Sequence, residues 1–185
     1  TKLAAAFDNE AEACSSLRRI QRLIAECVIN TDFIAKLILK LIPVKEPYFL
    51  SMDRTNWKFS DTNINILTLG IIHEGMVFPI VFKMMDKRGN SNTKERMELI
   101  SRFIRLAGDN SIAHLMADRE FAGSDRLAFL NSRGIHYHIR IRENFPVIRH
   151  GKESKAHWLF TDLKLGECKH LSGIYYDFCN FFMIK

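Results

Sequence analysis

The 185-residue sequence predicts an α/β protein with a mixed β-sheet, flanking helices, an N-terminal helical region and a partial β-strand insert. Residues 48–85 hold three apolar, strand-length segments that only short polar turns separate. Two further strand-length segments follow, and each comes after a segment with helical periodicity. The strands are too apolar at their centres to face water, so we expect helices to cover the sheet.

Residues 1–47 are predicted to form a helical region and a linker. Apolar residues recur at helical spacing from Leu17 to Val28. The polar segment Asn30-Thr31-Asp32 interrupts this pattern and supplies N-cap residues for a short, apolar helix over Phe33–Ile42. Pro43 ends that helix, because proline cannot continue one.

The three central strands are expected at Tyr48–Phe59, Ile64–His73 and Met76–Met85. Short polar residues join the first two strands and Glu74-Gly75 joins the next two, so the segments form an antiparallel meander. Pro79 lacks an amide donor, which favours a bulge or an edge position for the third strand. Asp53 is unusual here, because it is a carboxylate in the middle of a strand that otherwise helps to build a core.

A helix, a strand, a helix and a strand are expected downstream. The amphipathic segment Lys94–Leu106 is a helix, with N-cap residues just before it. Its inward residues are expected to be Met97, Ile100, Phe103 and Ile104. The strand Ile112–Ala117 ends at Asp118, and a helix over Asp125–Ser132 follows. Residues 135–142 then alternate between apolar and polar side chains, which is typical of a strand.

This order of elements is the one expected of a ribonuclease-H-like fold over residues 48–144. In such a fold the first and fourth strands lie side by side, so Asp53 and Asp118 are candidates to share one metal ion. Hard carboxylate oxygens suit Mg²⁺ or Mn²⁺, and such ions assist in-line phosphoryl transfer.

Residues 145–185 are predicted to be a β-rich insertion subdomain that is incomplete. Strand-like segments occur at residues 146–149, 157–165 and 173–185. The last of these is an apolar run, and an unpaired run of this kind would promote aggregation. We therefore expect it to pair within the insert, or the chain to be part of a longer one.

Basic side chains are concentrated near Asp118. The formal net charge is +6, and residues 126–152 contain six Lys or Arg and a single acid, Glu143. Alternation places four basic or titratable side chains on one face of the last core strand, which are His136, His138, Arg140 and Arg142. This pattern favours contact with a phosphate backbone, and a solvated strand face is the alternative.

A second basic patch lies on the first helix and consists of Arg18, Arg19 and Arg22. A solvated helix face is the simpler interpretation, and phosphate contact by an accessory DNA-binding domain is the alternative. The four cysteines lack zinc-site spacing, and we find neither a signal-peptide pattern nor an apolar run of membrane-spanning length. A cytoplasmic protein without a membrane partner is therefore expected.

Four segments together resemble the DDE transposases of bacterial insertion sequences. They are SMDRTNWKF around Asp53, DKRGNSNTKER before the helix, MADREF around Asp118, and GIHYHIRIREN in the last core strand. The resemblance is strongest to the family named after insertion sequence four. It extends over nearly the whole chain, and residues 48–144 are its specific part.

The resemblance implies a cut-and-paste transposase that nicks double-stranded DNA at terminal inverted repeats and joins the 3′ ends to target DNA. Such enzymes typically act as homodimers in a synaptic complex, here at the nucleoid. By position, Asp53 and Asp118 would be the first two catalytic acids and ligands of Mg²⁺ or Mn²⁺. Arg140 and Arg142 resemble the family's DNA-contacting positions, and Arg119 would either stabilise the fold or contact phosphate.

The third acid of the family is missing from its expected position. Tyr137 and Arg140 have the first spacing of the family's Tyr-Arg-Glu-Lys signature, but Asn144 stands where the signature requires Glu. We therefore expect this chain to be inactive by itself. A non-catalytic DNA-binding remnant or inhibitor, and a nuclease of the same fold, are the alternatives.

Several other residues allow two interpretations. Glu120 is a candidate to support a metal ligand without touching the metal if the strand continues past Asp118, and a surface position or an ordinary salt bridge is the alternative. Trp57 and Trp158 are expected to pack in or near the core rather than to stack on bases. His114 lies in apolar company and is expected to be a core or edge histidine rather than a metal ligand.

Overall fold

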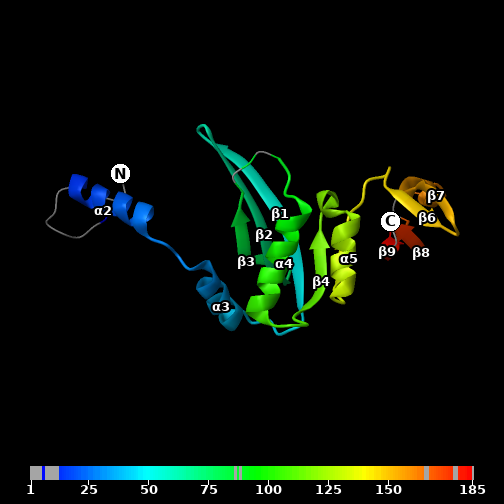
Figure 1. Ribbon diagram of the computed structural model, residues 1–185, viewed down its shortest axis with the longest axis horizontal. Helices are drawn as coiled ribbons and strands as arrows, with labels where there is room; N and C mark the ends of the chain where they lie inside the picture. The colour runs from blue at the N-terminus through cyan, green and yellow to red at the C-terminus, as the bar shows by residue number, and fades with distance from the viewer. Residues whose placement is uncertain are drawn as a thin grey trace. The chain divides into compact units, whose positions relative to one another are not determined.

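The computed structural model describes residue 6 and residues 13–85, 87, 89–164, 167–176 and 179–184. The chain divides into two units, residues 1–34 and residues 35–185 (Figure 1). The part of the predicted N-terminal helical region at residues 1–5 and 7–12 lies outside the described residues. None of the described helices is both long enough and apolar enough to cross a membrane.

The first unit contains helix α2 (Ala13–Glu26) and the start of helix α3 (Thr31–Leu41). The Asn30 side chain accepts hydrogen bonds from the amides of Asp32 and Phe33, at 3.1 and 3.0 Å. This cap explains why α3 begins at Thr31, two residues before the predicted start. From Ala35 onward α3 belongs to the second unit, where Ala35 is fully buried in the main core.

The second unit is built on a five-stranded sheet with the order β3-β2-β1-β4-β5. Its strands are β1 (Tyr48–Phe59), β2 (Thr62–His73), β3 (Met76–Met84), β4 (Ile112–Ala117) and β5 (His136–Ile139). The meander β1-β2-β3 is antiparallel, whereas β4 pairs parallel to both β1 and β5. The predicted α/β class and ribonuclease-H-like strand order are therefore confirmed.

Turn and bulge residues fit the meander as its sequence indicates. Glu74 and Gly75 have φ angles of 49° and 77°, which is the backbone of a tight hairpin turn. The β2–β3 register shifts beside Gly70, which pairs with Pro79. A Cβ at Gly70 would lie 2.7 Å from the Phe78 carbonyl oxygen, so only glycine fits at this bulge. β3 is an edge strand, and both expected features of Pro79 are present.

Helices α4 (Thr93–Ala107) and α5 (Ser124–Ser132) follow β3 and β4, and α4 packs against the sheet (Figure 1). The buried residues of α4 are Arg96, Leu99, Ile100 and Phe103. Ile100 and Phe103 were predicted to face inward, whereas Met97 and Ile104 are only half-buried. The inward stripe is rotated slightly, and it brings the charged Arg96 into the interior.

The last core strand is shorter than its alternating sequence predicts. Ile135–Arg142 was expected to be extended, but only His136–Ile139 pairs with β4. The Arg140 amide donates to the Ala117 carbonyl, and the β4 ladder ends at that point. The predicted alternation of faces is nevertheless present, because Ile135 is buried while His136, His138 and Arg140 are exposed.

A second sheet has the order β7-β6-β8-β9. It consists of β6 (Pro146–Arg149), β7 (Lys152–Lys155), β8 (His170–Tyr176) and β9 (Cys179–Ile184). The expected strand over residues 157–165 is wrong, because Ala156–Phe160 forms the 3₁₀ helix η2, which buries Ala156 and Phe160. The apolar run at the end of the sequence pairs with β8, as one of the two expectations for it required.

Both tryptophans lie at the surface, so the prediction that they pack in or near the core is wrong. Trp57 is 57% exposed and Trp158 is 63% exposed. Trp57 is in the part of β1 that extends past β4 and pairs only with β2. Trp158 lies on η2 between the buried ends of that helix.

Candidate active site

The β1–β4 pairing brings the two predicted acids together. Met52 pairs with Ala117 in the parallel ladder between these strands, and Asp53 and Asp118 are the next residues along each strand. Asp118 keeps an extended backbone, with φ −80° and ψ 172°. Both aspartates are exposed, whereas Met52 is buried on the helix-covered face. Because side chains alternate along a strand, both carboxylates are on the face opposite Met52 and Leu115.

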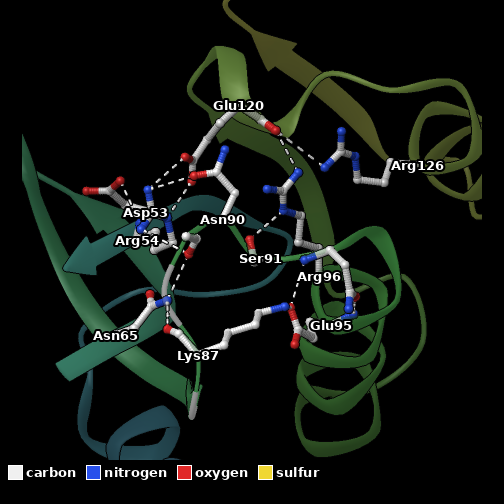
Figure 2. A network of polar contacts seen from close by, with 12 residues as sticks. Asp53, Arg54, Asn65, Lys87, Asn90, Ser91, Glu95, Arg96, Glu120 and Arg126 are labelled. Atoms are coloured by element: carbon white, nitrogen blue, oxygen red, sulfur yellow. Dashed lines mark hydrogen bonds and ion pairs between the residues drawn. The ribbon is translucent and has the colours of Figure 1, made fainter. Parts of the chain in front are cut away.

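The chain turns directly after Asp118. Arg119–Phe121 forms the 3₁₀ helix η1, so β4 does not continue as far as Glu120. The Glu120 carboxylate instead accepts two hydrogen bonds from the Arg54 guanidinium, at 3.1 Å from Nε and 3.2 Å from Nη2 (Figure 2). Arg54 directly follows Asp53, so this pair links the two segments that carry the acids.

The loop between β3 and α4 contributes to the same polar network (Figure 2). Asn90 accepts a hydrogen bond from Arg54 Nη2 at 3.1 Å. The buried Asn65 side chain on β2 donates to the carbonyls of Lys87 and Gly89, at 3.1 and 2.9 Å. The loop is therefore attached to two strands of the sheet at the end where Asp53 lies.

Arg96 holds the turn after Asp118 from the side of α4. It is buried, and its Nη1 donates to the Glu120 carbonyl at 2.6 Å while Nε donates to the Ser91 hydroxyl at 2.6 Å. Its guanidinium also lies over the Phe121 ring, 4.4 Å from the ring centre. Burial lowers the pKa of Arg96, and the nearby Glu120 opposes that change. A buried guanidinium requires hydrogen-bond acceptors such as these, because a buried donor without a partner is unfavourable.

The basic face predicted for the last strand lies beside Asp118. Arg140 Nη1 is 3.9 Å from Asp118 Oδ1, and both side chains are more than half exposed. A pair this exposed and this long contributes little to stability. It does place a cationic side chain next to one of the two acids. Arg142 and Arg119 are also exposed.

The remaining predicted arginines lie in the first unit. Arg18, Arg19 and Arg22 are exposed on α2. Their proposed contact with DNA therefore stays a prediction that concerns this helix alone.

The described residues supply part of the ligand set that a hard divalent cation requires. Two exposed aspartates at equivalent positions of paired strands supply the oxygen ligands that Mg²⁺ and Mn²⁺ prefer. In the described part of the chain, no three His, Cys, Asp or Glu side chains are grouped to hold one ion. Such a site would offer two protein ligands, and Mg²⁺ commonly keeps water and phosphate oxygens as its other ligands.

Arg54, Asn65, Asn90, Ser91 and Arg96 are among the network residues that the sequence pattern did not indicate as part of the site. Arg96 carried a usable signal, since it falls on the apolar stripe of α4, four residues before Ile100. Asn65 carried another, because it interrupts the apolar run of a central strand. The other three have no local signal, because their partners depend on the tertiary structure.

Comparisons with known proteins give weak structural likeness. No protein-family model and no curated protein matches the sequence. A chain of the simian T-cell lymphotropic virus intasome, in complex with PP2A regulatory subunit B56 gamma, aligns with a TM-score of 0.42 and 16% identity over 54% of this chain. The HTLV-2 integrase catalytic core domain in complex with magnesium aligns in its dimeric form with a TM-score of 0.41 and 16% identity over 53% of this chain. The chain spans 34% of the first of these proteins and 63% of the second.

Proposed function

We propose that this chain is the catalytic region of a DDE transposase, which cuts and joins DNA by divalent-metal-dependent phosphoryl transfer at the ends of a mobile element. The observation that carries the proposal is the β1–β4 register, which leads from Met52 and Ala117 directly to Asp53 and Asp118. Two carboxylates at equivalent positions of neighbouring parallel strands suit a shared ion better than scattered acids do.

Within this proposal each residue has a definite task. Asp53 and Asp118 would hold Mg²⁺ or Mn²⁺, and the ion would supply positive charge at the reacting phosphate and at the attacking oxygen. Arg140 and Arg142 bind the DNA backbone beside the acids, because exposed guanidinium groups pair well with phosphate oxygens. Terminal inverted repeats and target DNA are the proposed partners, and a homodimer is the proposed assembly.

Asn144 supports a second candidate function. It stands where the transposase signature requires the third acid, so a DNA-binding remnant that inhibits an intact enzyme is also consistent with this sequence. The two candidates differ in cleavage. A remnant binds DNA without metal-dependent nicking under any condition, whereas a catalytic region regains nicking when the third acid is supplied by a longer chain.

Replacing either acid tests the metal site. We expect the wild-type chain to bind Mn²⁺ in isothermal titration, and Asp53→Ala or Asp118→Ala to weaken binding at least about tenfold, because each change removes a direct ligand. Nicking of DNA that carries element ends is expected to be absent or very weak for the chain alone.

Asp61→Ala is the matched control, because Asp61 is an exposed aspartate in the turn between β1 and β2. Its Mn²⁺ affinity is expected to equal that of the wild type. Wild-type affinity in both Asp53→Ala and Asp118→Ala would overturn the proposed metal site.

A further inference from the structure

Arg54 and Glu120 form a partly buried ion pair directly behind the two acids. Arg54 is one residue after Asp53, and Glu120 is two residues after Asp118. Two parallel hydrogen bonds join them, and their side chains are only 15% and 19% exposed. A bidentate guanidinium–carboxylate pair of this kind fixes geometry as well as contributing energy.

The backbone ladder alone does not fix the spacing of the acids. The β1–β4 pairing ends at Met52 and Ala117, one residue before each aspartate. Beyond that point β1 continues along β2, whereas the chain after Asp118 turns into η1. In the described part of the chain, the Arg54–Glu120 pair joins these diverging segments through their side chains (Figure 2).

The pair is itself held firmly on both sides. Arg54 also donates to Asn90, at 3.1 Å. The Glu120 carbonyl accepts from Arg96 Nη1 at 2.6 Å and from Arg126 Nη1 at 3.5 Å. Because other groups anchor both Arg54 and Glu120, the contact between them restrains the backbone segments that carry Asp53 and Asp118.

Neither side chain is available for direct catalysis. Arg54 alternates with Asp53 along β1 and therefore points to the opposite face of the sheet. Its Nε and Nη2 donate to Glu120 and Asn90, and its Nη1 donates to the Gly89 carbonyl at 3.5 Å, so the guanidinium is held away from the Asp53 face. Glu120 likewise uses both carboxylate oxygens on Arg54.

We infer that Arg54 and Glu120 are positioning residues that set the separation of Asp53 and Asp118 for a divalent cation. This inference rests on the proposed function, because it assigns the two aspartates to a metal. It adds a requirement that the two acids alone do not imply: the metal affinity of the site depends on an ion pair that does not touch the metal.

Arg54→Met distinguishes a positioning role from a purely electrostatic role, because the two roles predict opposite changes in Mn²⁺ affinity. If Arg54 acted only as a nearby positive charge, its removal would leave Glu120 unpaired, make the site more negative and tighten Mn²⁺ binding. If the pair positions the acids, the same change weakens Mn²⁺ binding, by about tenfold as for other groups that orient metal ligands. Isothermal titration with Mn²⁺ measures whether the variant binds the ion more tightly or more weakly than the wild type.

The double variant Arg54→Met/Glu120→Gln provides a second criterion. Residues that act as one unit give non-additive effects, so the double variant is expected to bind Mn²⁺ about as weakly as Arg54→Met alone. Additive losses would mean that the two residues act separately, which overturns the inference. Lys83→Met is the matched control, since it breaks the 2.7 Å Lys83–Glu98 ion pair between β3 and α4 and should leave Mn²⁺ affinity unchanged.

Thermal denaturation shows which variants are folded before Mn²⁺ is added. If Arg54→Met does not fold, Arg54→Lys replaces it, because lysine keeps the charge but cannot form the two-pronged contact. Weaker Mn²⁺ binding by folded Arg54→Lys supports positioning, and wild-type or tighter binding overturns it. If the wild type binds no Mn²⁺, or Asp53→Ala binds it normally, the proposed metal site fails instead.

Discussion

His114 shows how the surroundings of one residue change its chemistry. Its ring stacks on Phe49 at 4.8 Å between centres and on His136 and His138 at 5.2 Å each. Its buried Nδ1 makes no hydrogen bond within the described part of the chain. Burial lowers the pKa of His114, and the positive charges that His138 and His136 can carry lower it further. The neutral ring is therefore the favoured form in the folded protein, in keeping with the predicted edge or core role.

A lowered histidine pKa gives a definite dependence of stability on pH. The folded protein binds this proton less readily than the unfolded chain, in which the pKa of histidine is about 6.5. The stabilising contribution of neutral His114 is complete above that value and is lost as the pH falls through the lower, folded-state pKa. We expect the melting temperature to decrease from neutral to mildly acidic pH, and to decrease less in His114→Gln.

His170→Gln is the control for this measurement, because His170 is an exposed histidine on β8. It should keep the pH dependence of the wild type. An unchanged dependence in His114→Gln would contradict the assigned role of burial and of the neighbouring histidines.

At the scale of elements, α4 is fixed at its start by a reciprocal cap. The Asn92 side chain accepts from the Glu95 amide at 2.8 Å, and the Glu95 carboxylate accepts from the Asn92 amide at 2.7 Å. Lys87 donates to the same carboxylate at 2.8 Å. Burial alone would raise the pKa of Glu95, but the hydrogen bonds from Lys87 and Asn92 lower it below its ordinary value. The cap therefore joins the loop of the polar network to the helix.

Asn92→Ala is expected to lower the free energy of unfolding by about 1 kcal/mol, the usual cost of losing an N-cap side chain. Urea denaturation followed by circular dichroism measures this change. Asn131→Ala, at an exposed position of α5, is the control and should alter the free energy by less than about 0.5 kcal/mol. A loss of similar size in both variants would contradict a specific capping role.

At the scale of the whole molecule, positive charge lies beside the acids. Arg140 approaches Asp118 at 3.9 Å, and Arg142 is exposed two residues later. Both belong to residues 126–152, which carry six Lys or Arg and one acid of a chain with formal net charge +6. A surface of this kind attracts polyanions and makes their binding sensitive to salt.

Salt dependence of DNA binding tests this surface. Each lost phosphate contact is expected to reduce the slope of log K against log salt by about 0.9, so Arg140→Ala/Arg142→Ala should reduce it by about 2. Fluorescence anisotropy with a short labelled duplex over a range of salt concentrations measures the slope. Arg105→Ala, an exposed arginine on α4, is the control and should leave the slope unchanged. If Arg105→Ala reduced the slope as much as Arg140→Ala/Arg142→Ala does, a localised DNA surface would be contradicted.

The amino-acid pattern by itself determined the order of the elements and much of the candidate site. Predicted and observed bounds agree for β1 and β4, and the Glu74-Gly75 turn and the bulge near Pro79 are present. These features depend on local forces, namely backbone preferences and the alternation of apolar side chains along a strand. Element order then implied that β1 and β4 are neighbours, and with them Asp53 and Asp118.

Only the tertiary structure decided which polar side chains meet. Arg54 and Glu120 are 66 residues apart, and nothing in either local segment indicates the other as its partner. Arg96 interrupts an apolar helix stripe, yet its hydrogen bonds to Ser91 and Glu120 exist only once the helix packs against the sheet. The physical reason is that polar partners are selected when burial removes water from both groups at once, and that event requires distant segments to be packed together.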